Sequence, residues 1–130
     1  MRLKHFRLDI GAQIFLACSD RSRLRVLSLI QDRGEMCITD LERVLDFTQS
    51  KTSRHLLYLK NSGILAIRKI NQWTFYSVKE EVQDLVRVIL GFVDRDPELV
   101  KDREICGVMH NNRELPGLQL MARNQPRNNG

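Results

Sequence analysis

The sequence predicts a mainly helical domain with one β-hairpin, and three observations lead to this fold class. Apolar residues recur every three or four positions over most of the chain, which is the spacing that gathers side chains on one face of a helix. After Gly63 the pattern changes, because residues 64–70 and 73–78 are rich in the β-branched and aromatic side chains that favour strands. The 130 residues are enough for one domain with a hydrophobic core.

Two helices are predicted before Gly34. In the first helix, four-residue steps form an apolar ridge of Phe6, Ile10, Ile14 and Cys18. Asp20 then suits the N-cap of a second helix that runs to about Ile30, because its carboxylate can accept an unpaired N–H of the first turn. Arg33 and Gly34 close this second helix.

A third and a fourth helix follow with only two residues between them. Thr39 and Glu42 form a capping box, in which the threonine caps the helix and the glutamate reaches back, and this box opens a short helix to about residue 45. Thr48 is a suitable N-cap for the next helix, and Gly63 supplies its left-handed end. Two helices joined in this way, with the second basic at its start, are typical of a helix-turn-helix.

The helix over 48–63 begins with a face of hydrogen-bonding and cationic side chains. This face consists of Gln49, Ser50, Lys51, Ser53 and Arg54. It contains no carboxylate, and its amides, hydroxyls and guanidinium group suit the base edges and phosphates of a DNA major groove. An ordinary solvated amphipathic helix has the same pattern, so the helix alone does not decide its role.

The distribution of charge favours the DNA-binding interpretation. The chain has a net charge of +5, and residues 47–79 contain six Lys or Arg and no Asp or Glu. This window therefore carries +6 and the rest of the chain −1. Such a localised basic region indicates a polyanionic partner.

The two predicted strands are joined by Asn71 and Gln72. Asn tolerates positive φ, so this pair predicts a tight turn and a β-hairpin. Arg68 and Lys69 flank the tip, which would let the hairpin lie along a phosphate backbone as a wing. A hairpin that only covers the core would have the same sequence pattern.

The C-terminal part predicts two more helices. The first, over residues 79–93, has an apolar stripe that Val88 and Phe92 widen beyond what a small domain needs to cover, which suggests a subunit interface. The second, over residues 96–110, starts with Asp as N-cap and Pro in the first turn.

These elements in order predict a winged helix-turn-helix with N- and C-terminal dimerisation helices. The predicted DNA-binding and dimerisation domain spans residues 1–112. Residues 113–130 are expected to be a disordered tail, because this stretch is rich in Asn, Arg, Gly and Pro.

Several function classes lack a sequence signal. No apolar run is long enough to span a membrane, and charges interrupt the N-terminus where a signal peptide would be apolar, so we expect a cytoplasmic protein. No phosphate-binding glycine loop, nucleophile–base pair or paired carboxylates indicate an enzyme. The expected partner is double-stranded DNA, no cofactor is required, and the alternative is a winged helix that binds other proteins.

The chain resembles the ArsR/SmtB family of bacterial metal- and stress-responsive repressors over roughly residues 15–93. The resemblance lies in CSDRSRLRVL (18–27), EMCITDL (35–41), TQSKTSRHL (48–56), LKNSGI (59–64) and the strand WTFY (73–76). It implies a homodimeric repressor that binds a near-palindromic operator and releases it when an effector binds. It also implies that Gln49, Ser50, Ser53 and Arg54 contact the major groove, that Lys51 lies near phosphate, and that the wing from Arg68 to Gln72 contacts the flanking minor groove or backbone.

The effector site departs from the family pattern. The arsenic-sensing branch carries Cys-Val-Cys where this chain has Cys37-Ile38-Thr39, so Cys37 alone cannot supply the three thiolates that trivalent arsenic prefers. The zinc-sensing branch places histidine and carboxylate ligands on the helix after the wing, and here that helix has no histidine.

The three cysteines leave three interpretations open. Cys18, Cys37 and Cys106 are widely spaced and odd in number, which does not suit a secreted disulfide framework. Cys106 and His110 lie four residues apart and could bind a soft metal with a ligand borrowed from Cys18 or His5. Alternatively, Cys18 and Cys106 could form a disulfide, a persulfide link or an arsenic bridge, so that As(III), a soft divalent metal or an oxidant or sulfide is the effector. The third interpretation is that all three are buried structural residues.

Overall fold

The computed structural model describes residues 5–124 and confirms the predicted fold class. The helices are α1 (Leu8–Ala17), α2 (Arg21–Arg33), α3 (Ile38–Leu45), α4 (Gln49–Asn61), α5 (Gln83–Gly91), α6 (Pro97–Asn111) and α7 (Pro116–Asn124). The strands are β1 (Met36–Cys37), β2 (Leu65–Ile70) and β3 (Trp73–Val78), and a 3₁₀ turn spans Glu80–Val82. The strands form one antiparallel sheet in the order β1-β3-β2.

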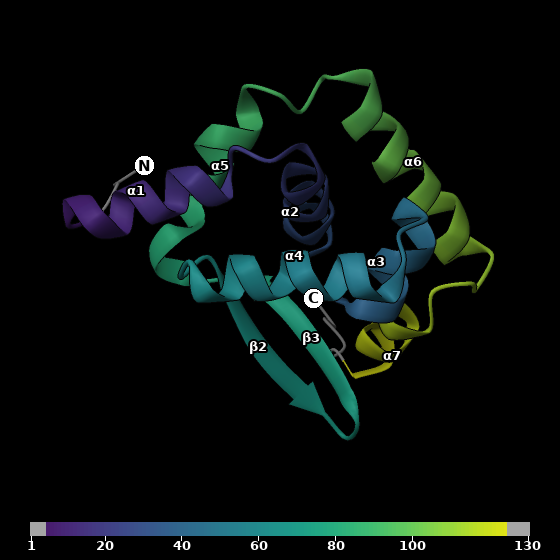
Figure 1. Cartoon of the computed structure of the whole chain (residues 1–130). Coiled ribbons are helices and arrows are strands. Elements are labelled where there is room, and N and C mark those ends of the chain that lie inside the picture. Colours follow the sequence, from purple (N-terminus) through teal and green to yellow (C-terminus); the bar gives the residue numbers. More distant parts are fainter. Residues whose placement is uncertain (1–4, 125–130) are drawn as a thin grey trace, which may run out of the picture.

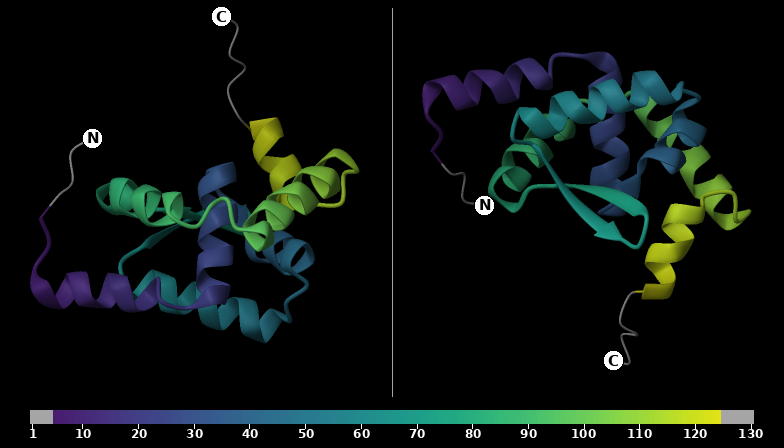
Figure 2. Two further views of the ribbon diagram at one scale, coloured as in Figure 1. Left: turned by 90° about the horizontal axis from the view of Figure 1, so that it is seen from above. Right: turned by 60° about the horizontal axis from the view of Figure 1, so that its bottom comes forward.

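Helix α2 lies at the centre of the molecule (Figure 1). Seen from above, it runs between α1 and α4 on one side and α5 and α6 on the other (Figure 2, left). The hairpin of β2 and β3 extends away from α4, while α1 and α5 lie at one end of the molecule and α7 at the other (Figures 1 and 2). The core between these elements includes the fully buried side chains of Leu27, Leu29, Ile30, Leu41, Leu59 and Phe75.

Three helices begin where the sequence predicts, because a local side chain caps each of them. The Asp20 carboxylate accepts the N–H of Arg23 at 3.0 Å at the start of α2. The Thr48 hydroxyl accepts the N–H of Lys51 at 3.1 Å at the start of α4, and Asp96 caps α6 in the same way. Each cap satisfies a donor that the helix itself leaves unpaired.

The predicted capping box at Thr39 is wrong. Helix α3 begins at Ile38 with Cys37 as its N-cap, two residues before the start that a Thr39 cap would give, and Thr39 lies inside its first turn. The cause is a strand pairing that the prediction missed, because Met36 and Cys37 lie opposite Tyr76 and Phe75 of β3. This pairing holds the chain extended up to Cys37, and the helix starts directly after it.

The long helix predicted over residues 79–93 is divided into two parts. A 3₁₀ turn at Glu80–Val82 comes first, and α5 then runs only from Gln83 to Gly91. Phe92 follows with 86% of its surface exposed, so the surplus apolar surface expected at this end of the molecule is present. Within residues 5–124, no helix is both long and apolar enough to cross a membrane.

The expectation of a disordered tail over residues 113–130 is wrong for the part that the structure describes. Residues 116–124 form α7, which packs against α3 and β1. The helix is held there because Leu115, Leu118 and Met121 are buried, a spacing of three residues that the polar composition of this stretch conceals. Residues 125–130 lie outside the described residues.

Candidate nucleic-acid interface and thiol positions

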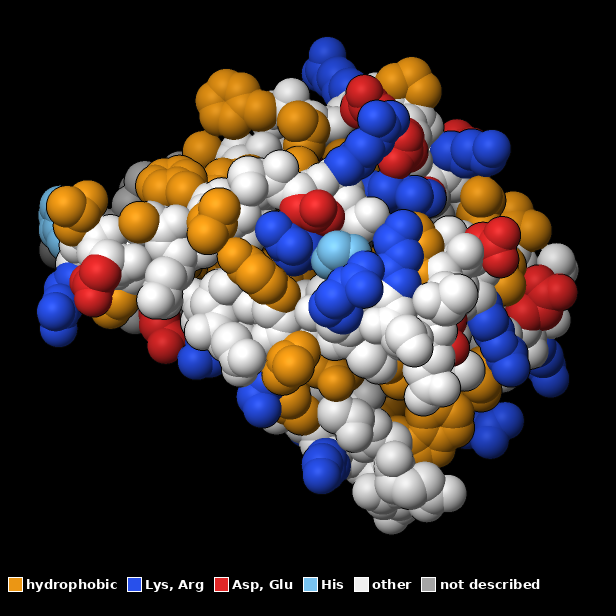
Figure 3. Space-filling model, viewed as in Figure 1, with side chains coloured by type: hydrophobic (Ala, Val, Ile, Leu, Met, Phe, Trp, Pro, Cys, Tyr) orange, Lys and Arg blue, Asp and Glu red, His pale blue; other side chains and the backbone are white. Residues whose placement is uncertain are grey.

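The exposed face of α4 carries the side chains that the sequence predicts for DNA contact. Its opposite face packs into the core through Thr52, His55, Leu56 and Leu59, all of which are buried. Gln49, Ser50, Ser53 and Arg54 are therefore turned to solvent, and Lys51 is half-buried beside them. On the side of the molecule where α4 lies, Lys and Arg side chains gather over the middle of the surface (Figure 3).

Phe47, in the turn before α4, holds the basic side chains at the start of this helix. The Lys51 Nζ lies 3.9 Å from the centre of the Phe47 ring, and the Arg25 guanidinium lies 5.2 Å from it. Both distances are within the range of a cation–π interaction. The ring thus joins the turn, α2 and the first turn of α4 into one surface.

His55 is a packing residue on the buried face of α4. Its Nδ1 lies 4.0 Å from a carboxylate oxygen of Asp20, and only 7% of its surface is exposed. Burial lowers the pKa of the imidazole, and the Asp20 charge only partly opposes this effect. The side chain is therefore neutral at neutral pH and adds no charge to the basic surface.

Arg23 was missed by the sequence predictions, although it lies next to α4. Its Nε donates to the carbonyl oxygen of Ala17 at 2.7 Å and its Nη2 to that of Leu16 at 3.3 Å, both at the end of α1. Its guanidinium also lies 4.1 Å from the centre of the Tyr58 ring on α4. One side chain of α2 thus connects α1 to α4.

The wing differs from its predicted arrangement at Arg68. This side chain donates two hydrogen bonds to the Glu35 carboxylate, at 3.0 and 2.7 Å, so its charge is balanced within the chain. Lys69, Asn71 and Gln72 are exposed at and beside the tip, and Asn71 adopts the predicted positive φ, 55°.

A shallow groove of about 270 Å³ separates α4 from the hairpin. It is lined by Ser53, Leu56, Leu57, Lys60, Ile67 and Tyr76. Leu57 is more than half exposed on the same helix face as Ser50 and Ser53. The groove therefore continues the α4 surface toward the wing.

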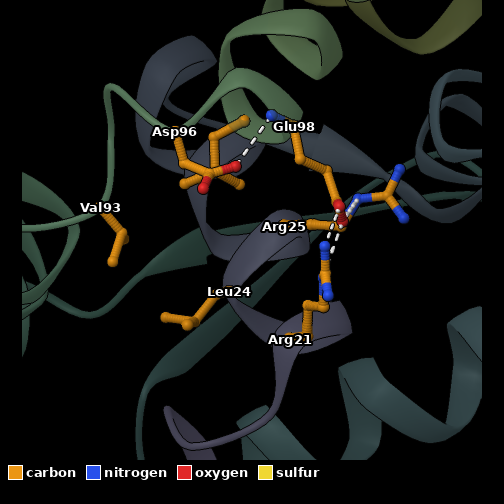
Figure 4. A pocket seen from close by; sticks show the side chains of 7 residues that line it. Arg21, Leu24, Arg25, Val93, Asp96 and Glu98 are labelled. Carbon is orange, nitrogen blue, oxygen red and sulfur yellow. Dashed lines mark hydrogen bonds and ion pairs between the residues drawn. The ribbon is translucent and has the colours of Figure 1, made fainter.

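An ion-pair ladder attaches α6 to α2 beside the start of α4 (Figure 4). The Glu98 carboxylate pairs with Arg21 at 2.6 Å and with Arg25 at 3.2 Å. Arg25 also donates two hydrogen bonds to Asp102, at 2.9 and 3.0 Å, and Asp102 is only 2% exposed. Arg21 and Arg25 are four positions apart on α2, and Glu98 and Asp102 are four positions apart on α6, so each pair lies on one helix face. The sequence predictions did not use this spacing.

Next to this ladder lies a hollow of about 270 Å³, drawn in Figure 4. Arg21, Leu24, Arg25, Val93, Asp96, Glu98 and Leu99 line it. Arg21, Arg25 and Glu98 at its edge are paired with one another, and the Asp96 carboxylate accepts the N–H of Glu98 at 2.9 Å.

All three cysteines are free and buried, on three different elements. Cys18 ends α1, Cys37 ends β1 and Cys106 lies in α6. Burial raises the pKa of each thiol, and that of Cys37 to about 11. Among residues 5–124, no three side chains of His, Cys, Asp or Glu gather into a metal-binding group, so the single chain does not assemble ligands around Cys106 and His110.

Comparison with known proteins agrees with this geometry. The sequence pattern of the bacterial regulatory proteins of the arsR family matches residues 20–66, which run from the start of α2 into the wing. The chain is 38% identical over 96 residues to the arsenic resistance transcriptional regulator ArsR1 of Pseudomonas putida, covering 72% of this chain and 75% of that protein. The chain belongs to the ArsR family of bacterial regulatory proteins.

Further similarities of this ArsR-family protein agree with that assignment. The arsenical resistance operon repressor of Escherichia coli is 39% identical over 70 residues, which cover 54% of this chain and 60% of the repressor. A homodimeric winged helix-turn-helix DNA-binding domain from Mycobacterium bovis has the same fold, with a TM-score of 0.61, 24% identity and coverage of 70% and 84% of the two chains. The protein is thus a DNA-binding transcriptional regulator and not an enzyme.

Proposed function

We propose that this ArsR-family protein is a homodimeric repressor that reads a near-palindromic operator and releases it when a thiol-directed effector binds. The observation that carries the DNA-binding part is the exposed face of α4, where the polar residues of the first two turns include no carboxylate. A helix of this kind fits the major groove, where donors and acceptors on base edges differ for each base pair.

The proposed DNA contacts fall into two groups, those with base edges and those with the phosphate backbone or the minor groove. Gln49, Ser50, Ser53 and Arg54 are proposed to meet base edges, since their amide, hydroxyl and guanidinium groups match them. Lys51 is proposed to contact phosphate. In the wing, Lys69, Asn71 and Gln72 are proposed to contact the flanking minor groove or backbone, whereas Arg68 is restrained by its ion pair with Glu35.

The dimer is proposed to form through the end of the molecule where α1 and α5 lie. Three apolar side chains are strongly exposed on α1, namely Leu8, Phe15 and Leu16. Phe92 lies exposed directly after α5 at the same end of the molecule (Figure 1). A second copy is the proposed occupant, because two recognition helices must be joined rigidly to read two half-sites, and the Mycobacterium bovis relative is homodimeric.

The effector is proposed to act through the cysteines, in the cytoplasm where the operator is. Two relatives are named for arsenic or arsenical resistance, which supports As(III) or another soft metal. Cys37 supports this part of the proposal most directly, since it immediately precedes α3, the first helix of the helix-turn-helix. Cys18, Cys106 and His110 are the remaining proposed effector positions.

Fluorescence anisotropy on duplex DNA from the region upstream of the protein's own gene tests both parts. Arg54→Ala is expected to weaken binding by about 1–3 kcal/mol and to relax specificity at one base position, because a guanidinium contact to a base edge is lost. Arg95→Ala, an exposed arginine between α5 and α6, is the matched control and should bind like the wild type.

The same assay addresses the effector. Arsenite, zinc or a mild oxidant is added to the reduced protein on its operator, and one of them is expected to release the DNA. Release that persists in Cys37→Ser would exclude Cys37 as the acting thiol. Binding that none of these agents disturbs would overturn the effector part of the proposal, and an Arg54→Ala variant with unchanged affinity would overturn the DNA-contact part.

A further inference from the structure

We propose that α7 is a latch over Cys37, so that docking of α7 and attachment of any group to the Cys37 sulfur exclude each other. This inference goes beyond DNA binding, because it concerns the control of one thiol by a segment that follows the winged helix-turn-helix. Only its connection to operator release rests on the proposed function.

The latch is held by a buried carboxylate on α3. Asp40 is completely buried, and its carboxylate accepts the N–H of Gly117 at 3.2 Å and the N–H of Leu118 at 2.8 Å. These two amides belong to the first turn of α7, whose N–H groups have no partner within the helix. Asp40 therefore caps α7 from 77 residues away, and its charge is favourable at the positive end of the helix dipole.

The Cys37 thiol lies under the same turn of α7. Its Sγ and an oxygen of the Asp40 carboxylate both lie against Gly117, so the thiol and the acceptor of the two α7 amides line the same turn. Gly117 approaches this pair so closely that a β-carbon on it would collide with Cys37 Sγ and lie 2.7 Å from an oxygen of Asp40. A side chain at this position would force Cys37 and Asp40 to move, so glycine allows α7 to dock this closely.

The same lack of space excludes a substituent on the sulfur. A methyl group at Gly117 already overlaps Cys37 Sγ, so an atom bonded to Sγ in that direction would overlap the backbone of Gly117. Core regions of proteins are too densely packed to absorb such a group without movement. The first turn of α7 must therefore leave before Cys37 reacts, and it cannot return afterwards.

The remaining contacts of α7 are few, so the helix can detach as a unit. Leu115, Leu118 and Met121 bury its apolar face, and Arg43 of α3 donates to the carbonyl oxygen of Glu114 at 2.7 Å. A helix of nine residues has little stability of its own, so these contacts and the Asp40 cap decide whether it is formed. Detachment would expose Cys37 and Asp40 at the start of α3 while leaving α4 in place.

Alkylation by iodoacetamide, followed by peptide mass spectrometry of the full-length protein, tests the latch. The Cys37 thiolate attacks the methylene carbon, the S–C bond forms as the C–I bond breaks, iodide leaves and the thiol proton passes to solvent. Gly117→Ala is expected to raise the Cys37 alkylation rate by about tenfold or more, because the local opening that precedes reaction becomes the dominant state. Gly107→Ala on α6 is the matched control, since a β-carbon there meets only ordinary contacts.

Cys18 provides an internal control in the same experiment, because it is the C-cap residue of α1, whereas α7 packs against α3 and β1. A Cys37 rate that rises while the Cys18 rate stays constant supports the latch. Equal Cys37 rates in the wild type and in Gly117→Ala would overturn it.

A second measurement uses the wild-type sequence and does not depend on the folding of a variant. After alkylation of Cys37, amide hydrogen exchange is expected to show that residues 117–121 lose protection, while the amides of α2 keep theirs. Alkylated protein in which these α7 amides remain protected would overturn the proposal. Neither measurement involves DNA, so a failure of the latch and a failure of the proposed function remain distinguishable.

Discussion

At the scale of single residues, Arg68 illustrates how one neighbouring carboxylate changes the role of a side chain. Its position beside the tip of a basic hairpin predicts a phosphate contact. In the folded chain, Glu35 accepts both of its hydrogen bonds, and Glu35 is 33 residues away in the sequence. Lys69, on the next position of the same strand, is exposed and carries the available charge of the wing.

This pairing leads to a prediction about salt dependence. Glu35→Gln removes the charge that balances Arg68, so Arg68 becomes available to a phosphate of the DNA. Binding is expected to tighten, and the slope of log affinity against log salt to steepen by about one. Titrations at several salt concentrations measure this slope. Glu104→Gln changes the net charge equally at an exposed site on α6, and a steepening of the same size there would contradict the prediction.

At the scale of elements, the helices that could be predicted are those whose ends are determined locally. Asp20, Thr48 and Asp96 each cap the helix that follows them directly, so the sequence contains the whole signal. The exposed face of α4 could be predicted for the same reason, because helical periodicity alone separates it from the buried face.

The elements that were wrongly predicted depend on distant partners. Helix α3 starts at Ile38 because Met36 and Cys37 pair with β3, nearly forty residues later in the chain. Helix α7 is capped by Asp40, and no residue close to it in the sequence indicates that cap. Contacts of this kind can be identified only when the tertiary structure is known.

The ladder between α2 and α6 gives a prediction about stability. Arg25→Met leaves the Asp102 carboxylate buried without its cation and is expected to lower the free energy of unfolding by about 3 kcal/mol. Arg25→Met combined with Asp102→Leu removes both charges and should restore most of this loss. Urea unfolding of the two variants measures the difference, and equal destabilisation in both would show that the pairing of charges is not the cause.

At the scale of the whole molecule, the two ends of the molecule have different surfaces. The end with α1 and α5 exposes Leu8, Phe15, Leu16 and Phe92, whereas α7 at the other end buries its apolar residues against α3 and β1. The hydrophobic surface is thus concentrated where the proposed second copy would bind, on a side of the molecule that leaves α4 accessible (Figures 1 and 3).

This asymmetry predicts which substitution separates the subunits. Phe92→Glu places a charge in the proposed interface and is expected to convert the dimer into a monomer with an unchanged fold. Val108→Glu is the control, because Val108 is also strongly exposed but lies on α6, away from α1 and α5. Light scattering coupled to size-exclusion chromatography measures the mass, and a dimeric Phe92→Glu variant would exclude this interface.

The connection that Arg23 makes between α1 and α4 has a mechanical consequence in such a dimer. Its guanidinium binds the last carbonyl groups of α1 and lies over Tyr58 of α4, so the two helices share one rigid support. Any change in how the two subunits meet along α1 therefore also tilts or shifts α4. In the proposed dimer, the reach of this one arginine would therefore help to set the distance between the two recognition helices, and with it the operator spacing.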